Sequence, residues 1–407
     1  MRAVVAAVLT VSVLASACNG SEDGGDGGSE PEPESEQEAT EPELFEGGDF
    51  YAVPDPLPEG EPGDLVRYEV VDDGAGGDFA IWRIMYLSES LQGDPIAVTG
   101  SALVPTAPAP AEGRNAVAVA HGTTGISDVC APSRDPYESL DLGMISGSPF
   151  PVLAFSDYEG LGTPGRHPYL VGESEGRGTL DSLKAARQLP DAEVGDRYGI
   201  WGYSQGGHAA MFAHQLAEEW GPDDMDLVGT VAGAPATEMP MIFQSAGSQP
   251  GSGFFYMIIA GFEAAYPEAD PSLILTPAGV EILDAVDRGC TGGGIFAAAA
   301  SRPTSELLQA GYVEANPWPE LMEANNPGTV ATDDPLLILH SAADEIVLAT
   351  FSELTFERLC ELGQVVERRV YEQGDGHNAA SVDAALDGFA WLDSLFKGDV
   401  EPVDGCP

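Results

Sequence analysis

The feature that most constrains the fold of this chain is the ten-residue stretch at 199–208, GIWGYSQGGH. It joins a short apolar segment to a helix-forming one, and between them stands the pattern Gly-x-Ser-x-Gly at 202–206. This pattern is typical of a tight strand-to-helix turn, because a side chain at either glycine would collide with the strand or the helix. The turn exposes the hydroxyl of Ser204 and directs the next backbone N–H, that of Gln205, to the same point. The helix that follows, expected over 208–217, brings its positive N-terminal end to a site where negative charge could develop.

The pentapeptide alone allows two interpretations. A glycine-rich turn with an ordinary serine arises easily by chance, whereas a nucleophilic serine needs a base and an acid from other parts of the chain. The strand and helix that flank the turn, together with the partners found downstream, favour the nucleophile.

Composition limits the classes of function. The chain has 407 residues, of which 43% are hydrophobic, enough for one large α/β domain with an insertion. The formal net charge is −51 with only 16 basic residues, which argues against a nucleic-acid partner because no basic surface is available to meet phosphates. The same charge argues against an acidic substrate. No cofactor is predicted, and the sequence leaves the oligomeric state open.

Residues 1–17 are predicted to be a signal peptide, since Arg2 precedes an apolar run over 3–14 that is too short to span a bilayer. The run is followed by Ala-Ser-Ala and then Cys18. Cleavage before Cys18 would leave a cysteine for lipid attachment, as in a bacterial lipoprotein, and would place the protein on the cell surface. The Ala-x-Ala triplet also fits an ordinary signal peptidase, which would release the protein freely. Both alternatives predict export.

Residues 18–64 are expected to form an acidic, disordered tether. From 19 to 64 the sequence is mostly Gly, Glu, Asp, Pro and Ser, and it contains no Lys or Arg. Such a composition buries too little apolar surface to order itself. If Cys18 carries lipid, the tether would hold the following domain away from the membrane.

Strand and helix signals from residue 65 onward predict an α/β fold. Three segments over 65–105 resemble antiparallel strands, whereas the later strand segments are almost wholly apolar, as strands covered on both faces are. Helical segments alternate with the later strands, which implies a mostly parallel sheet with helices on both faces. Besides the segment before Ser204, the expected strands are 65–70, 80–87, 95–105, 115–120, 151–156, 227–233, 335–340 and 364–371, and the expected helices are 179–187, 208–217, 350–362 and 379–396.

Residues 238–332 interrupt this alternation with helical stretches rich in Ala, Phe, Ile and Met. We predict that they form a helical cap, or lid, over the active site. The alternative, that this segment only extends the core, stays open. The predicted core then comprises 65–237 and 333–407, and the expected cap helices are 253–265, 279–288 and 295–311.

Two strand ends carry the partners that a nucleophilic Ser204 needs. Function in an open α/β sheet lies at the carboxyl ends of the strands, and Asp344 follows the strand expected at 335–340. Asp344 can accept the Nδ1–H of a histidine and hold its tautomer, and the neighbouring Glu345 is the alternative acid. His377 follows the last strand in a glycine-rich turn and is the predicted base. The order Ser, acid, His is that of the α/β-hydrolase fold.

The sequence HGTTG after the strand at 115–120 is typical of an oxyanion loop. Such a loop supplies a second backbone N–H beside that of Gln205. Thr123 is the expected donor, Thr124 is the alternative, and His121 is expected to brace the loop. Four further histidines are predicted to be packing or surface residues: His167, His208, His214 and His340.

The remaining cysteines form an even set in a chain that is predicted to be exported, so two disulfides are expected. Their spacings do not resemble zinc-ligand pairs, and no metal site is predicted. The spacing alone leaves the connectivity open. These cysteines are Cys130, Cys290, Cys360 and Cys406.

Several of these motifs together resemble the secretory lipases, the family of the fungal lipase A type and its actinobacterial relatives. The combination of GYSQGG at 202–207 with DYEGLG at 157–162 is more specific than the serine turn alone, and the resemblance covers most of the chain from about Asp49 onward. Further shared segments are HGTTG at 121–125, CAPS at 130–133, HPYL at 167–170, GRG at 176–178 and the surroundings of Asp344 and His377.

The resemblance implies an α/β-hydrolase fold with a helical cap and the hydrolysis of triacylglycerols or simpler carboxylic esters. It also implies the disulfides Cys130–Cys290 and Cys360–Cys406. The fungal members place an acidic residue near the oxyanion position, where this chain has a threonine. The acidic leader is not a feature of the family.

Together these features predict an exported lipase or carboxylesterase that acts on a lipid or small ester through an acyl-enzyme on Ser204. The apolar segment 254–259 fits an acyl tunnel, a lid or plain packing, so lipase and short-chain esterase stay open. Two other classes are considered. A serine peptidase or amidase would use the same triad, and a non-catalytic surface lipoprotein could share the scaffold but would not react with a fluorophosphonate.

Overall fold

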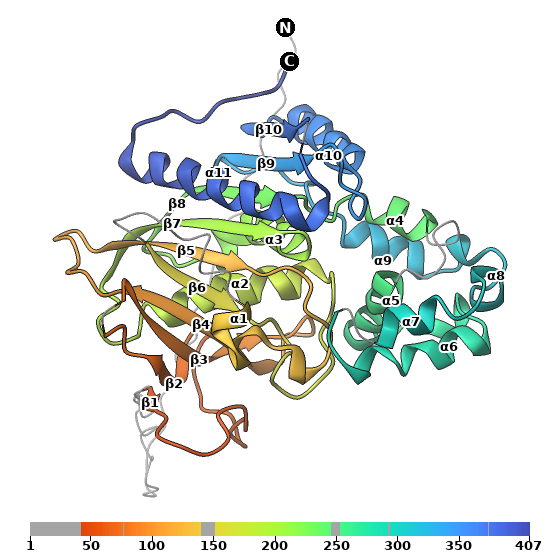
Figure 1. The fold of residues 1–407 in the computed structure, drawn as a ribbon, viewed down its shortest axis with the longest axis horizontal. Helices are drawn as coiled ribbons and strands as arrows, with labels where there is room; N and C mark the ends of the chain where they lie inside the picture. Colours follow the sequence, from red (N-terminus) through yellow and green to blue (C-terminus); the bar gives the residue numbers. More distant parts are fainter. Residues whose placement is uncertain (1–41, 76, 140–150, 246–252, 292–293, 373) are drawn as a thin grey trace, which may run out of the picture. The chain divides into compact units, whose positions relative to one another are not determined.

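The structure, a computed structural model, describes residues 42–75, 77–139, 151–245, 253–291, 294–372 and 374–407 (Figure 1). The predicted signal peptide, Cys18 and the first part of the predicted tether lie outside these residues. The strands of the described residues form one sheet in the order β1-β2-β3-β4-β6-β5-β7-β8-β9-β10. They are β1 (Glu43–Leu44), β2 (Leu65–Asp72), β3 (Phe79–Glu89), β4 (Pro95–Pro105), β5 (Arg114–Ala120), β6 (Val152–Ser156), β7 (Val194–Tyr203), β8 (Asp226–Gly233), β9 (Leu336–Ser341) and β10 (Val366–Tyr371).

The sheet is mixed and mostly parallel, which confirms the predicted fold class. Strands β2, β3, β4 and β6 pair antiparallel in succession. From β6 onward, through β5, β7, β8 and β9 to β10, each strand is parallel to the next. Parallel neighbours need crossover connections, and helices supply most of them here. The carboxyl ends of β5, β7, β8 and β9 therefore meet at one edge of the sheet.

Helices cover both faces of the sheet, and β5 shows why its sequence is apolar throughout. Side chains alternate between the two faces of a strand. Ala118 packs in a cluster with Leu183 of α2 and Ala210 of α3, whereas the adjacent Val119 packs in a cluster with Trp391 of α11. The helices outside the cap segment are α1 (Pro136–Ser139), α2 (Gly172–Ala186), α3 (Gln205–Trp220), α10 (Ala349–Leu362) and α11 (His377–Lys397).

The prediction of a disordered tether up to residue 64 is wrong for its last part. Strand β1 pairs in parallel with β2, and Phe50 is buried in a cluster with Met85 and Ala97. The hydroxyl of Tyr51 lies 2.8 Å from that of Ser133. The aromatic residues scattered through this acidic segment supply enough apolar surface to dock it on β3 and β4. The folded domain therefore includes residues that precede β2.

The segment predicted to be a cap forms a helical layer, and its buried apolar residues cluster with Ile126 and residues 169–171 from the preceding part of the chain. Its largest buried aromatic residues, Phe262 and Trp318, are fully buried and stack 6.4 Å apart between ring centroids. The predicted helix at 253–265 is present as α5, but the one predicted at 295–311 is broken, because Pro303 has no N–H to continue it. The cap helices are α4 (Met239–Ser245), α5 (Gly253–Ala265), α6 (Pro277–Leu283), α7 (Gly294–Ala299), α8 (Thr304–Leu307) and α9 (Trp318–Ala324).

The structure contains both disulfides that the family resemblance implied. Cys130–Cys290 joins the segment after β5 to the cap, with the Cα atoms 5.4 Å apart, and Cys360–Cys406 joins α10 to the C-terminal segment at 5.5 Å. Among the described residues, no helix combines the length and apolar character needed to cross a membrane.

Candidate active site

The turn at Ser204 has the strained geometry expected from its sequence. β7 ends at Tyr203, α3 begins at Gln205, and Ser204 between them has φ 61° and ψ −118°. A Cβ atom added to Gly202 would lie 2.0 Å from the carbonyl oxygen of Gly206, and one added to Gly206 would lie 2.0 Å from that of Ala120. Both glycines are therefore required for steric reasons. The backbone is held in place by a 2.9 Å hydrogen bond from the Ser204 N–H to Gly233 at the end of β8.

Three elements bring Ser204, His377 and Asp344 together. His377 is the first residue of α11, and its Nε2 lies 2.9 Å from the Oγ of Ser204. Its Nδ1 lies 2.6 Å from the Oδ2 of Asp344, which follows β9. The imidazole and the carboxylate are both buried, while Ser204 is half-buried. The chain of distances fits a serine that transfers its proton to an imidazole oriented by a carboxylate.

The carboxylate of Asp344 is held in its ionised form. Its Oδ1 accepts the backbone N–H groups of Ile346 and Val347 at 2.9 and 2.8 Å. Burial by itself would raise the pKa of Asp344, but the hydrogen bonds from His340 and His377 and the charge of His377 outweigh burial. The pKa of Asp344 is therefore held well below its ordinary value.

The rival acid, Glu345, has a different position. Its Oε2 accepts the backbone N–H of His377 at 3.1 Å. The N-cap residue of α11 is Gly376, which has no side chain to cap the helix, so Glu345 places a negative charge at the positive end of α11. Tyr203 also donates its hydroxyl to the carbonyl of His377 at 2.7 Å. Glu345 thus holds the backbone of His377, whereas Asp344 contacts its ring.

The predicted oxyanion loop follows β5 and is braced as expected. Nε2 of His121 lies 3.2 Å from the Asp157 carbonyl oxygen, and Tyr158 donates its hydroxyl to the His121 carbonyl at 3.0 Å. The hydroxyl of Thr123 lies 2.8 Å from that of Tyr169. The Thr124 carbonyl instead accepts from the backbone of Thr291, outside the loop. The N–H of Gln205, as the first residue of α3, has no partner within the helix.

A buried polar network beneath Gln205 was missed by sequence reasoning. Glu175 of α2 is fully buried, and its Oε1 accepts the side-chain amide of Gln205 at 2.8 Å. Its Oε2 lies 2.9 Å from Nδ1 of His208. Burial lowers the pKa of His167 to about 4, and its Nε2 lies 2.7 Å from the Gln205 amide nitrogen. His167 and His208 therefore belong to the support of the site. The only signal in the sequence was a carboxylate on a helical face otherwise made of small residues.

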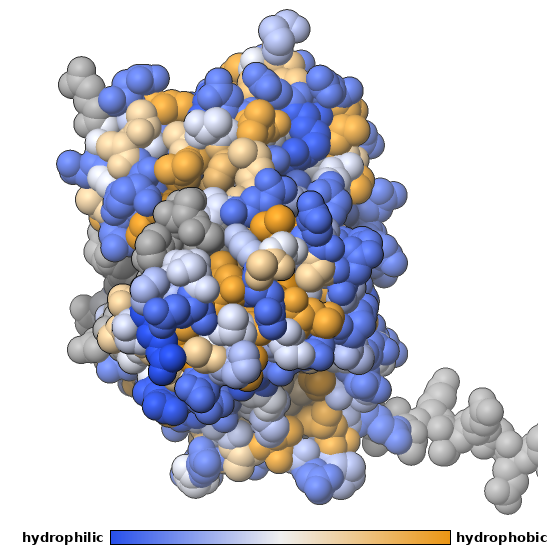
Figure 2. Space-filling model, turned by 90° about the vertical axis from the view of Figure 1, so that its right-hand side faces the viewer, coloured by the Kyte–Doolittle hydropathy of each residue, from blue (hydrophilic) through white to orange (hydrophobic). Residues whose placement is uncertain are grey.

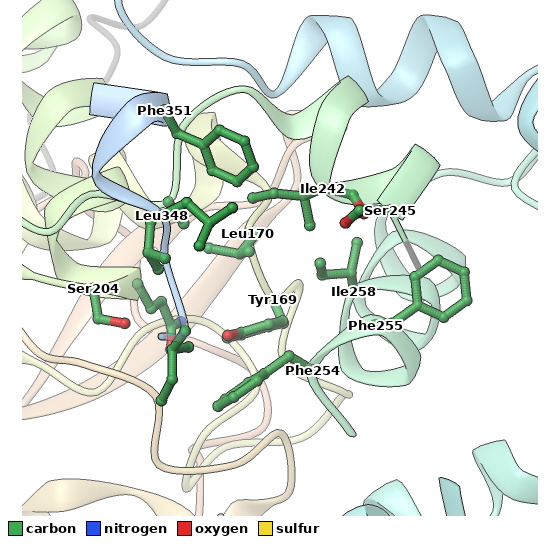
Figure 3. A pocket seen from close by; sticks show the side chains of 14 residues that line it. Tyr169, Leu170, Ser204, Ile242, Ser245, Phe254, Phe255, Ile258, Leu348 and Phe351 are labelled. Atoms are coloured by element: carbon green, nitrogen blue, oxygen red, sulfur yellow. The ribbon is translucent and has the colours of Figure 1, made fainter. Parts of the chain in front are cut away.

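Ser204 lies on an apolar cavity of about 80 Å³ between the sheet and the cap (Figure 3). Phe254, Phe255 and Ile258 of α5 line it from the cap, and Leu348 and Phe351 line it from the segment that enters α10. The hydroxyl of Tyr169 points toward the side where Ser204 lies. The other lining residues are Leu170, Gln205, Ala236, Ile242, Ser245, Ile346 and Val347.

The face that carries the cap exposes apolar side chains between hydrophilic ones (Figure 2). Ile346 and Leu348, which line the cavity, are 37% and 44% exposed, and Met241 of α4 is 42% exposed. Two residues of the cavity lining are therefore also exposed to solvent. Among the described residues, no group of three His, Cys, Asp or Glu side chains could hold a metal ion.

Comparison with known proteins places the chain in a family. The family model for secretory lipases matches residues 150–405 of the chain. Lipase 6 of Candida albicans is 24% identical over 395 residues, which are 88% of this chain and 82% of that protein. A trichothecene C-3 esterase of Fusarium sporotrichioides is 24% identical over 282 residues, 62% of this chain and 59% of that protein.

The fold is also similar to that of a solved lipase structure. The X-ray structure of Candida antarctica lipase A in its closed state superimposes with a TM-score of 0.68. The match covers 84% of each chain at 19% sequence identity. The mixed sheet with its helices is therefore similar to that of lipase A.

Proposed function

The chain belongs to the secretory lipase family, and from that premise we propose that it hydrolyses carboxylic esters through an acyl-enzyme formed on Ser204. The observation that carries the proposal is the row of close contacts that joins Ser204, His377 and Asp344. Nε2 of His377 is 2.9 Å from the serine oxygen, Nδ1 is 2.6 Å from Asp344, and the serine borders an apolar cavity.

Each step of the reaction has a residue in position for it. His377 accepts the proton of Ser204 as the oxygen attacks the ester carbonyl, and Asp344 stabilises the imidazolium that forms. The backbone N–H groups of Gln205 and Thr123 would hold the oxyanion, and we favour Thr123 over Thr124 because its hydroxyl pairs with the cavity residue Tyr169. His377 then protonates the leaving alcohol, and water repeats the sequence to release the acid.

The cavity supports an ester with an apolar acyl group, either a triacylglycerol or a simpler carboxylic ester. Its lining is mostly aliphatic and aromatic, and it includes the exposed Ile346 and Leu348. Burial of an acyl chain there would contribute about 0.8 kcal/mol per methylene. The net charge of −51 favours neutral esters over anionic ones and helps expel the carboxylate product. A serine peptidase or amidase, or a non-catalytic lipoprotein, has no comparable support from the cavity.

A pair of substitutions in α5 tests whether this cavity receives the acyl chain. Ile258 lines the cavity, whereas Ile259 is fully buried in the core of the cap. In a series of p-nitrophenyl esters from acetate to palmitate, Ile258→Ala should shift the preference toward a longer acyl chain, because the substitution widens the cavity. Each additional methylene accommodated should change the relative rate by about fourfold.

Ile259→Ala is the matched control, since it removes the same atoms from the same helix. It should lower the stability by about 2–5 kcal/mol without changing the chain-length preference. Equal shifts in both variants would place the acyl chain elsewhere. Measuring each series with and without an emulsified substrate would separate a lipase from a short-chain esterase.

We also propose that the protein is exported and attached to the cell surface through Cys18. The two disulfides and the secretory family support export. Incorporation of labelled palmitate into the full-length chain should occur with the wild type and be lost with Cys18→Ser. Export without incorporation would instead favour the freely secreted alternative.

A further inference from the structure

A second histidine lies against the carboxylate of Asp344. His340 is the fifth residue of β9 and is almost fully buried. Its Nε2 is 3.4 Å from the Oδ2 of Asp344, the same oxygen that contacts His377, and 2.9 Å from the carbonyl oxygen of Val347. Its Nδ1 is 2.8 Å from the hydroxyl oxygen of Ser352. The prediction that His340 is only a packing or surface residue did not anticipate these contacts.

The partners of His340 fix the direction of its hydrogen bonds. Nε2 faces two acceptors, a carboxylate and a carbonyl, so Nε2 carries the proton of the neutral ring. The Ser352 hydroxyl accepts the Nε–H of Arg368 at 3.0 Å, and its own proton faces both Nδ1 of His340 and the Ala349 carbonyl at 3.0 Å. That carbonyl also accepts from Arg368 at 2.8 Å, so the Ser352 proton can turn to Nδ1, the acceptor of a ring that is protonated at Nε2. Arg368 lies on the neighbouring strand β10. Arg368, Ser352 and His340 therefore form a chain in which each group donates toward Asp344.

We propose that His340, oriented by Ser352 and Arg368, is a positioning residue that divides the charge of Asp344 between two imidazoles. Without the donor at Nε2 of His340, the negative charge on Oδ2 would act on His377 alone. The imidazolium of His377 would then be stabilised more strongly, and the base would stay protonated to higher pH. The inference rests on the proposed function, in which His377 is the base.

The other charged groups near His377 and Arg368 are unchanged in the His340 and Ser352 variants that test the proposal. Glu345 and Tyr203 face His377 from the segment after β9 and from β7. Glu353 and Glu372 act on Arg368 from α10 and from the segment after β10. A shift in the pH profile on changing His340 or Ser352 therefore reports the loss of the hydrogen bonds that run through Ser352 and His340 to Asp344.

The test is the acidic limb of the pH profile of kcat/KM on a soluble p-nitrophenyl ester, which reports the protonation of the base in the free enzyme. His340→Leu should move the midpoint of this limb to higher pH by about 0.5–1 unit, the size expected for the loss of one charge-assisted hydrogen bond. Ser352→Ala, which leaves the ring in place, should move it in the same direction by less. His340→Gln keeps an N–H near the position of Nε2 and should restore most of the wild-type limb.

His214 provides the matched control, because it is also a buried histidine with both nitrogens hydrogen-bonded. Its partners are the hydroxyls of Thr230 and Thr332, far from Asp344 in the fold. His214→Leu should lower the melting temperature without moving the limb. If His340→Leu does not fold, Ser352→Ala decides the matter, because the proposal requires its limb to move to higher pH.

An unchanged limb in the active Ser352→Ala and His340→Leu variants, or an equal shift in His214→Leu, would overturn the inference. An inactive wild-type protein would contradict the proposed function instead. The downfield proton resonance of Nδ1 of His377 gives a readout that does not need turnover. Its titration midpoint should move with the kinetic limb.

Discussion

Replacement of Ser204 by alanine is expected to abolish ester hydrolysis and leave the fold unchanged. The substitution removes the oxygen that lies 2.9 Å from Nε2 of His377, so no acyl-enzyme can form. The loss in kcat should be on the order of 10⁶, leaving only the activity that binding and the oxyanion donors provide. Alanine and serine meet the same backbone strain at φ 61°, so thermal unfolding should be little affected. The rate on p-nitrophenyl butyrate and the melting temperature measure the two effects.

A fluorophosphonate probe separates this outcome from a general loss of structure. The wild type should be labelled, and Ser204→Ala should not. Ser394→Ala changes a serine of α11 whose hydroxyl only bonds the carbonyl of Trp391, so it should keep both labelling and activity. Activity near the wild-type level in a folded Ser204→Ala protein would remove Ser204 as the nucleophile. It would also remove the acyl-enzyme mechanism.

Replacement of Asp344 by asparagine is expected to lower kcat by about 10⁴. The Oδ1 of Asp344 accepts two backbone N–H groups, so the oxygen of an asparagine would take that position. The amide NH₂ would then face Nδ1 of His377, where the carboxylate accepts a proton in the wild type. Two donors cannot share a hydrogen bond, and the ring would be driven to the tautomer in which Nε2 carries the proton. In that tautomer Nε2 cannot accept the proton of Ser204.

Glu345→Gln is the control for this prediction. A glutamine keeps an oxygen for the backbone N–H of His377 and loses only the charge at the start of α11. The cost should be about 0.3–1 kcal/mol of stability and less than a tenfold change in kcat. If Glu345→Gln lost as much activity as Asp344→Asn, the acid of the triad would be Glu345. Both variants should be compared at the same pH, on the plateau of the wild-type profile.

The local sequence determined the elements that place the site. The Gly-x-Ser-x-Gly turn follows from collisions that a Cβ would meet at Gly202 and Gly206, which depend on only a few neighbouring residues. The strand β5 could be recognised because its residues are apolar on both alternating faces, a pattern typical of strands in a sheet that helices cover on both sides. The order of strands, cap and partner residues then placed Asp344 and His377 at the correct edge.

The tertiary structure decided what the neighbouring residues do. The sequence offered both Asp344 and Glu345 as the acid, and only the position of α11 shows that one contacts the ring and the other the backbone of His377. The docking of Phe50 on β3 and β4 was likewise hidden, because composition averages over a segment while packing depends on single side chains.

The buried residues that hydrogen-bond to the site could not be predicted from the sequence either. Glu175 and His340 lie on elements whose hydrophobic patterns indicate burial. Such a pattern does not reveal which polar group will form the hydrogen bond to a buried polar side chain. Those pairings join residues that are far apart in the chain, such as Glu175 with Gln205 and Ser352 with Arg368 on another element. The sequence by itself therefore determined the backbone that carries Ser204. The folded chain decided the hydrogen bonds that set its reactivity, because they depend on distances that exist only after the sheet and helices have packed.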